Sequence, residues 1–192
     1  MLKRSLFLLM FAIAAISTVR AQDYTKNELY GTYSFLSTDV DVLEHEGFHG
    51  YGIGYQYNVS KGFGLVAEWT SNHGTVGPIQ IPGRIILSVD ARVNALLFGP
   101  RFSYRTRPVT LYAHYLLGSA SSRVGYDNAP GIKNTEFAQA VGGGVDFNVT
   151  KSFAIRAGQF DYLAIHSDLP LNNGGSSWFR NFRYQAGAVF KF

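Results

Sequence analysis

The sequence of 192 residues has no cysteine, only two methionines and few charged residues, 16% of the chain. Without cysteine there is no disulfide framework and no thiolate chemistry. Low charge combined with 15% aromatic residues excludes a disordered or coiled-coil chain. No His, Asp and Glu spacing typical of a metal site recurs, and no glycine-rich loop precedes a helix. We therefore expect no metal and no cofactor.

The formal net charge of +4 comes mostly from the N-terminus. Three of the 17 basic residues and none of the 13 acidic ones lie in the first 21 positions, so residues 22–192 carry a net charge of only +1. A nucleic-acid-binding protein needs a basic patch on its folded part. The charge therefore argues against nucleic acid as a partner.

One apolar run, Leu6–Ile16, follows two basic residues at the N-terminus. It is shorter than a bilayer-spanning helix, and small residues follow it at positions −3 and −1 of a cleavage site after Ala21. The pattern predicts a signal peptide over residues 1–21 and one domain over 22–192. The alternative is an uncleaved N-terminal anchor.

The rest of the chain alternates between apolar and polar residues with a period of two, the pattern of half-buried strands. In 48–59, for example, one face carries Tyr51, Ile53, Tyr55 and Tyr57, and glycines occupy much of the other. Eight such segments are predicted as strands: 28–36, 48–59, 63–73, 94–105, 109–120, 134–148, 152–162 and 179–192. In 152–162 the phase changes near Gln159–Asp161, which indicates a bulge.

The connections between these segments alternate between short and long. Residues 60–62, 106–108 and 149–151 form tight turns, and the other connections are longer and polar or rich in Gly and Pro. Transmembrane barrels have short periplasmic turns and long extracellular loops, with strands of about 9–11 residues across the bilayer. The sequence thus predicts an all-β, eight-stranded antiparallel up-and-down transmembrane β-barrel.

The aromatic face decides between a soluble lipocalin-like barrel and a membrane barrel. An eight-stranded barrel has an interior just wide enough for side chains, and the aromatic set would overfill it. We therefore place the aromatic residues toward lipid, gathered in two interfacial girdles. The predicted girdle positions are Tyr57, Phe63, Trp69, Phe102, Tyr104, Tyr115, Phe147, Phe153 and Phe182.

The opposite face carries charged residues, which must point into the lumen. Counting residues from the short turns places Glu68 and Arg101 at similar heights on adjacent strands, and Asp146 and Arg156 likewise. Neighbouring strands lie about 4.8 Å apart, so each pair is expected to meet. We interpret both as structural ion pairs of the lumen; the alternative is a gate that opens a narrow water path.

The chain resembles the small eight-stranded outer-membrane β-barrel family, the group that includes OmpX and the membrane domain of OmpA. The matching pieces are the strands Leu97–Tyr104 and Val141–Phe147, and the alternating C-terminal strand Phe182–Phe192. The resemblance implies location in a Gram-negative outer membrane. It also implies that Phe190 and Phe192 resemble the signal read by the barrel-assembly machinery.

We expect a monomeric protein with outer-membrane lipid around it, a structural or surface-interaction role, and variable loops that contact a surface ligand. The alternatives are a narrow porin-like pore for small solutes and a lipid A-modifying enzyme. Four histidines, His49, His73, His114 and His166, are predicted near the loop end, but no nucleophile–base–carboxylate spacing accompanies them. We therefore expect no enzymatic activity.

Overall fold

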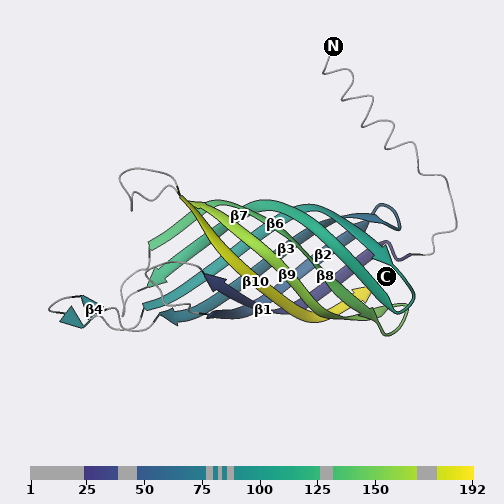
Figure 1. Ribbon diagram of the computed structural model, residues 1–192, viewed down its shortest axis with the longest axis horizontal. Coiled ribbons are helices and arrows are strands. Elements are labelled where there is room, and N and C mark those ends of the chain that lie inside the picture. Colours follow the sequence, from purple (N-terminus) through teal and green to yellow (C-terminus); the bar gives the residue numbers. More distant parts are fainter. Residues whose placement is uncertain are drawn as a thin grey trace, which may run out of the picture.

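Eight antiparallel strands form a closed barrel in the computed structural model, which describes residues 24–38, 47–76, 80–81, 84–85, 89–125, 132–167 and 177–192 (Figure 1). The barrel strands are β1 (Asn27–Thr38), β2 (Gly47–Asn58), β3 (Phe63–Val76), β6 (Val89–Arg105), β7 (Val109–Gly125), β8 (Ile132–Asn148), β9 (Phe153–Ser167) and β10 (Ser177–Lys191). Two short strands, β4 (Gln80–Ile81) and β5 (Arg84–Ile85), pair with each other. The predicted fold and all eight predicted strands are confirmed.

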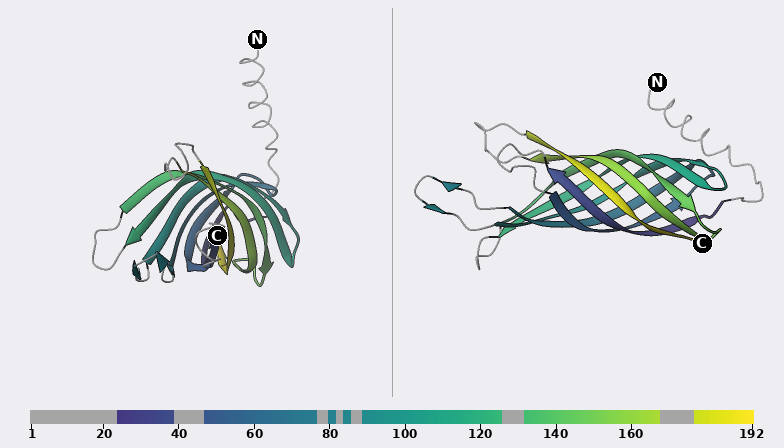
Figure 2. Two further views of the ribbon diagram at one scale, coloured as in Figure 1. Left: turned by 60° about the vertical axis from the view of Figure 1, so that its left-hand side comes forward. Right: turned by 60° about the horizontal axis from the view of Figure 1, so that its bottom comes forward.

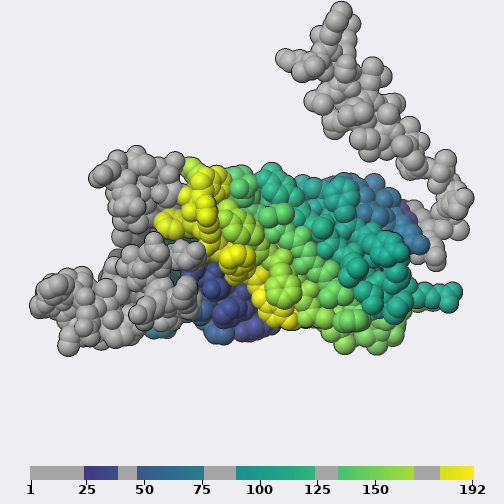
Figure 3. Space-filling view, viewed as in Figure 1, coloured from purple at the N-terminus to yellow at the C-terminus, as the bar shows by residue number. Residues whose placement is uncertain are grey.

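The first and last strands close the barrel by pairing with each other, in the order β1-β10-β9-β8-β7-β6-β3-β2. Their register runs from Glu28 opposite Lys191 to Thr38 opposite Asn181. Figures 1 and 2 show the strands running obliquely around a long cylinder, and in the space-filling view the side chains of β1, β9 and β10 adjoin on one face (Figure 3). Closure leaves no unpaired strand edge, as a membrane requires. Within the described ranges, no helix has the length and apolar character needed to cross a bilayer.

Side chains alternate between the lumen and the outer wall, as predicted. Along β2 the residues from Tyr51 to Asn58 are exposed and buried in strict turn. The outer wall carries the large apolar side chains, including Phe102, Tyr104 and Phe182, which are each more than 60% exposed. The nine predicted girdle residues all lie on this outer face: Tyr57, Phe63, Trp69, Phe102, Tyr104, Tyr115, Phe147, Phe153 and Phe182. Ring contacts such as Phe63–Phe102 cover part of their surface.

The three short turns and the C-terminus lie at one end of the barrel. Each turn closes with backbone hydrogen bonds, for example from the Thr106 amide to the Val109 carbonyl at 2.8 Å. At the same end, the backbones of Asn27 and Phe192 exchange two hydrogen bonds of 3.0 and 2.9 Å. The strand ends that precede and follow the four long connections lie at the other end, and most residues of these connections are outside the described ranges.

A bulge interrupts β9, close to where the change of phase predicts it. In the pairing of β8 with β9, Val145 lies opposite Gly158, but the next residue, Asp146, lies opposite Arg156, so Ala157 is skipped. A matching shift occurs in the pairing of β9 with β10. The extra residue moves the inward side of the strand from even to odd positions. As a result Arg156, Gln159 and Asp161 all point into the lumen from one strand and are buried.

Candidate functional site

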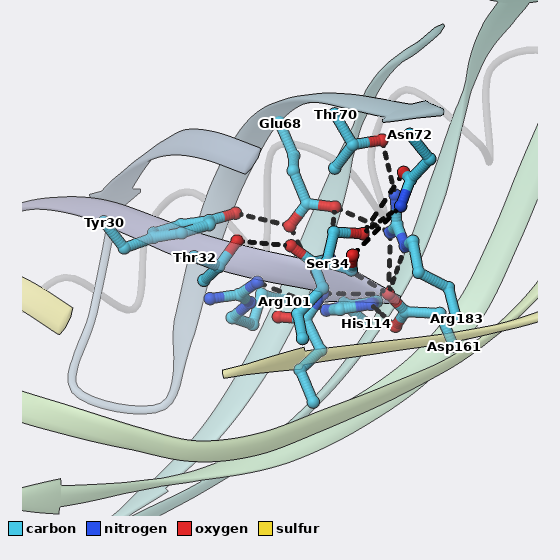
Figure 4. Close-up of polar contacts among 12 residues, drawn as sticks. Tyr30, Thr32, Ser34, Glu68, Thr70, Asn72, Arg101, His114, Asp161 and Arg183 are labelled. Atoms are coloured by element: carbon cyan, nitrogen blue, oxygen red, sulfur yellow. Dashed lines mark hydrogen bonds and ion pairs between the residues drawn. The ribbon is translucent and has the colours of Figure 1, made fainter. Parts of the chain in front are cut away.

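The middle of the lumen holds a buried network of charged and polar side chains (Figure 4). Its ionic members are three arginines and three carboxylates, so their formal charges cancel, and none of the six is more than 2% exposed: Glu68, Asp146, Asp161, Arg101, Arg156 and Arg183. Three glutamines complete it, namely Gln56, Gln159 and Gln185. Burial of charge is tolerated only when each group is paired and hydrogen-bonded.

Glu68 and Asp161 are joined by the guanidinium of Arg183. One Arg183 nitrogen, Nη2, lies 2.6 Å from Glu68 Oε1 and 2.6 Å from Asp161 Oδ2. Glu68 also accepts hydrogen bonds from the Tyr30 hydroxyl at 2.9 Å and the Gln185 amide at 3.1 Å. Figure 4 shows the side chains of Tyr30, Glu68, Asp161 and Arg183 converging from separate strands. Because β3 and β10 are not neighbours, this bridge crosses the lumen.

The expected pairing of Glu68 with Arg101 is wrong. In the β3–β6 register Glu68 lies opposite Leu97, and Arg101 lies opposite Gly64, four residues away along the strand. Strands of a closed barrel are staggered, so equal counts from two different turns do not give equal positions in the ladder. Arg101 instead donates to Gln56 Oε1 at 2.8 Å and contacts His114 Nδ1 at 3.3 Å.

Asp146 and Arg156 do form the pair that the tight turn between them predicts. Arg156 Nε donates to Asp146 Oδ1 at 2.9 Å, and Nη2 donates to Oδ2 at 3.3 Å, a two-point contact. The Arg156 guanidinium also lies 4.1 Å from the centre of the Tyr30 ring and 4.8 Å from that of Tyr112. Arg101 approaches the same two rings at 5.4 and 4.2 Å, so each guanidinium gains cation–π contacts.

His114 points into this network rather than toward the loops, which corrects the position expected for it. Its Nε2 lies 2.7 Å from Asp161 Oδ1, and both side chains are inaccessible to water. His49 and His73 are exposed on the outer wall, and the His166 ring contacts Trp178. No group of three metal-ligating side chains occurs among the residues that the structure describes.

A hydrophobic cluster fills the barrel on the loop side of the network. On five strands a large apolar side chain follows a network or lumen residue in the direction of the loops, and each is no more than 3% exposed: Leu36, Phe48, Leu97, Leu116 and Leu163. These side chains bury apolar surface against one another. Buried apolar side chains therefore adjoin the polar network on its loop side.

The end with the short turns is hollow. A cavity of about 1060 Å³ opens there, lined among others by Glu28, Arg105, Asn148 and Lys191. Arg105 pairs with Glu28 at 3.0 Å, and Lys191 Nζ donates to Asn148 Oδ1 at 2.5 Å.

The profile of the family described as outer membrane protein beta-barrel domain matches residues 5–192. The chain belongs to this family. It is an outer-membrane protein. In barrels of this kind the end with the short turns faces the periplasm. No curated protein sequence matches it.

Solved structures similar to this outer-membrane barrel include Neisserial surface protein A (14% identity, TM-score 0.67, 88% of this chain and 98% of that one). OprG from Pseudomonas aeruginosa follows the same path (11% identity, TM-score 0.61, 91% and 99%). Ail, the attachment invasion locus protein of Yersinia pestis, was solved with the heparin analogue sucrose octasulfate (17% identity, TM-score 0.51, 86% and 96%). At these identities the likeness establishes the fold.

Proposed function

We propose that this protein is a sealed, monomeric outer-membrane barrel whose role is structural or surface-interacting. The observation that carries the proposal is the closed lumen. Each of the eight barrel strands contributes a side chain that is at most 3% exposed, as seen for Tyr30, Gln56, Glu68, Arg101, Leu116, Asp146, Gln159 and Gln185. A water-filled channel would leave such side chains accessible to water.

Three strands are long enough to extend beyond the outer surface of the membrane, which supports a surface role. Strands β6, β7 and β8 have 17 residues each, against 12 in β1 and β2. A tilted strand needs about 9–11 residues to cross the bilayer, so the longer strands reach outside. The sulfated sugar bound to Ail supports the proposal that a barrel of this kind presents a surface ligand site.

Planar-bilayer recordings test the sealed lumen. We expect no steady unitary conductance from the purified protein, and none after its loops are deleted. A stable conductance that increases when Arg183 or Glu68 is shortened would favour the alternative, a narrow pore for small solutes. Adhesion of cells that express the protein, with and without residues 126–131, tests the surface role.

We propose no enzymatic role. The His114–Asp161 pair is the closest approach to a catalytic dyad in the described lumen, but both groups are buried and the other ring nitrogen of His114 faces Arg101. A substrate cannot reach them, and the hydrogen-bond partners of His114 in the described lumen, Arg101 and Asp161, include no nucleophile. Mass spectrometry of lipid A with and without expression tests the alternative, a lipid A-modifying enzyme.

Biogenesis follows from the same proposal. Residues 1–21 serve as the signal peptide for export in a Gram-negative cell, and the C-terminal strand is read by the barrel-assembly machinery. Phe190 and Phe192 are both more than half exposed on the outer face, where a receptor can contact them before closure. Detection of a mature N-terminus at Gln22 by mass spectrometry tests the cleavage site.

A further inference from the structure

A row of basic residues crosses four adjacent strands on the outer wall. His49 on β2 lies opposite His73 on β3, His73 lies opposite Arg92 on β6, and Arg92 lies opposite Arg123 on β7. The backbone register continues to Lys133 on β8. We call His49, His73, Arg92 and Arg123 the basic row. With strands about 4.8 Å apart, it extends over about 14 Å.

The charges of Arg92 and Arg123 in the basic row are not neutralised by the described part of the protein. All four side chains are exposed, and Arg92 and Arg123 have no ion pair with a described carboxylate. Asp90, two residues before Arg92 on the same face, accepts a hydrogen bond from Thr75 Oγ1 at 2.9 Å. Like charges placed directly opposite in a sheet are destabilising. The arrangement therefore favours an anionic ligand that would offset this repulsion.

The height of the basic row along the barrel axis indicates which part of the membrane surrounds it, and therefore which anions can reach it. A strand crosses the hydrocarbon in about 9–11 residues. Counted from the periplasmic ends at Tyr57 and Phe63, this places His49 and His73 at the outer boundary of the hydrocarbon. Counted from Tyr104 and Val109, it places Arg92 and Arg123 a few residues above that boundary. The histidine end of the row thus lies beside the acyl chains, and the arginine end lies in the headgroup layer.

Neighbouring contacts support this placement. The His49 ring lies 5.2 Å from the ring of Phe35, and its Nδ1 contacts the Tyr33 hydroxyl, so aromatic side chains hold its lower end. On β6 and β7 the exposed Leu96 and Leu117 lie on the same outer face as the arginines, nearer to the short-turn end of the barrel. Aromatic and polar side chains together are typical of the membrane interface.

We propose that the basic row binds phosphate groups on the headgroups of the outer-leaflet lipid. Arginine recognises phosphate through two parallel hydrogen bonds, and two arginines in adjacent positions suit a headgroup with more than one phosphate. A lipid phosphate reaches the row without leaving the leaflet, because the row lies on the wall that faces lipid. A soluble sulfated polysaccharide would have to enter the headgroup layer from outside.

The experiment uses the full protein in nanodiscs of phosphatidylcholine with a small fraction of bisphosphorylated lipid A. The test variant is R92Q/R123Q. The matched control is R107Q/K151Q, which removes two exposed basic residues from the short periplasmic turns. Retained lipid A is counted by native mass spectrometry, and the folded gel band verifies that each variant folds. R92Q and R123Q as single variants replace the double variant if it does not fold.

We expect lipid A to bind about 25-fold more weakly to R92Q/R123Q than to the parent, because each basic residue beside an anionic headgroup contributes a factor of about five. The control variant should bind lipid A as tightly as the parent does. Neither the parent nor the control should retain lipid A that lacks its phosphates. Equal retention by parent and test variant, or by lipid A with and without phosphates, overturns the proposal. Loss of heparin binding in phosphatidylcholine discs with unchanged lipid A binding overturns it in favour of a soluble polyanion.

Discussion

Replacement of Glu68 by alanine should destabilise the barrel by about 3–5 kcal/mol, the cost of removing one partner from a buried ion pair. Glu68 accepts hydrogen bonds from Arg183, Tyr30, Gln185 and Gln159 at 2.6–3.2 Å. Without it the remaining five buried ionic groups carry a net charge of +1, and the Tyr30 hydroxyl loses the carboxylate to which it donates. Glu68→Gln keeps the shape but not the charge, so its cost should be about 1.5–3 kcal/mol.

The assay is urea unfolding from phospholipid vesicles, followed by tryptophan fluorescence and by the heat-dependent gel shift. Asp90→Ala is the matched control, because it removes an exposed carboxylate of the same sign. In the double variant Glu68→Ala/Arg183→Met the charge balance returns, so its loss should be smaller than the sum of the two single losses. Equal stability of Glu68→Ala and the parent would refute the structural role of the network.

Three further changes test other features. Gly54→Ala should cost about 1–3 kcal/mol in the same urea assay, because its Cβ would lie 2.1 Å from the Tyr30 ring; unchanged stability would mean that Tyr30 is not held there. Ile53→Arg on the lipid face should cost about 2–4 kcal/mol in vesicles, whereas Thr135→Arg near the loops should cost little. Deletion of Phe192 should lower the folded fraction in outer-membrane preparations more than it lowers the folded fraction obtained by refolding in detergent. An equal loss of folded protein in both would argue against a role in assembly.

The alternation of residues could be read from the sequence because a strand has a period of two and one face must meet lipid. The Asp146–Arg156 pair could be predicted as well, since the turn at 149–151 fixes the register of its hairpin. The Glu68–Arg101 prediction failed because β3 and β6 are joined at the loop end, so no short turn at the periplasmic end sets their stagger. Local turn chemistry predicts register only within its own hairpin.

The Glu68–Arg183 ion pair could not be predicted from the register of a hairpin either, for a different reason. It connects strands that are not neighbours, and its partner Asp161 points inward only because of the bulge in β9. The change of phase near Gln159 was visible in the sequence, and it could have identified Asp161 as a lumen residue. His114 likewise has the inward parity of Tyr112 and Leu116 on β7.

The glycines on the inner face explain how so many large polar side chains fit into a narrow lumen. A Cβ at Gly54 would meet Tyr30, one at Gly142 would meet Asp161, and one at Gly144 would meet Tyr112, all within 2.5 Å. Tyr30, Asp161 and Tyr112 thus occupy space that a glycine on a nearby strand leaves open. Because the middle of the lumen is filled in this way, a ligand that arrives from outside the cell has the outer wall and the loop end available to it. The unneutralised charges of the basic row lie on that outer surface, so the same packing that closes the interior leaves recognition to the exterior.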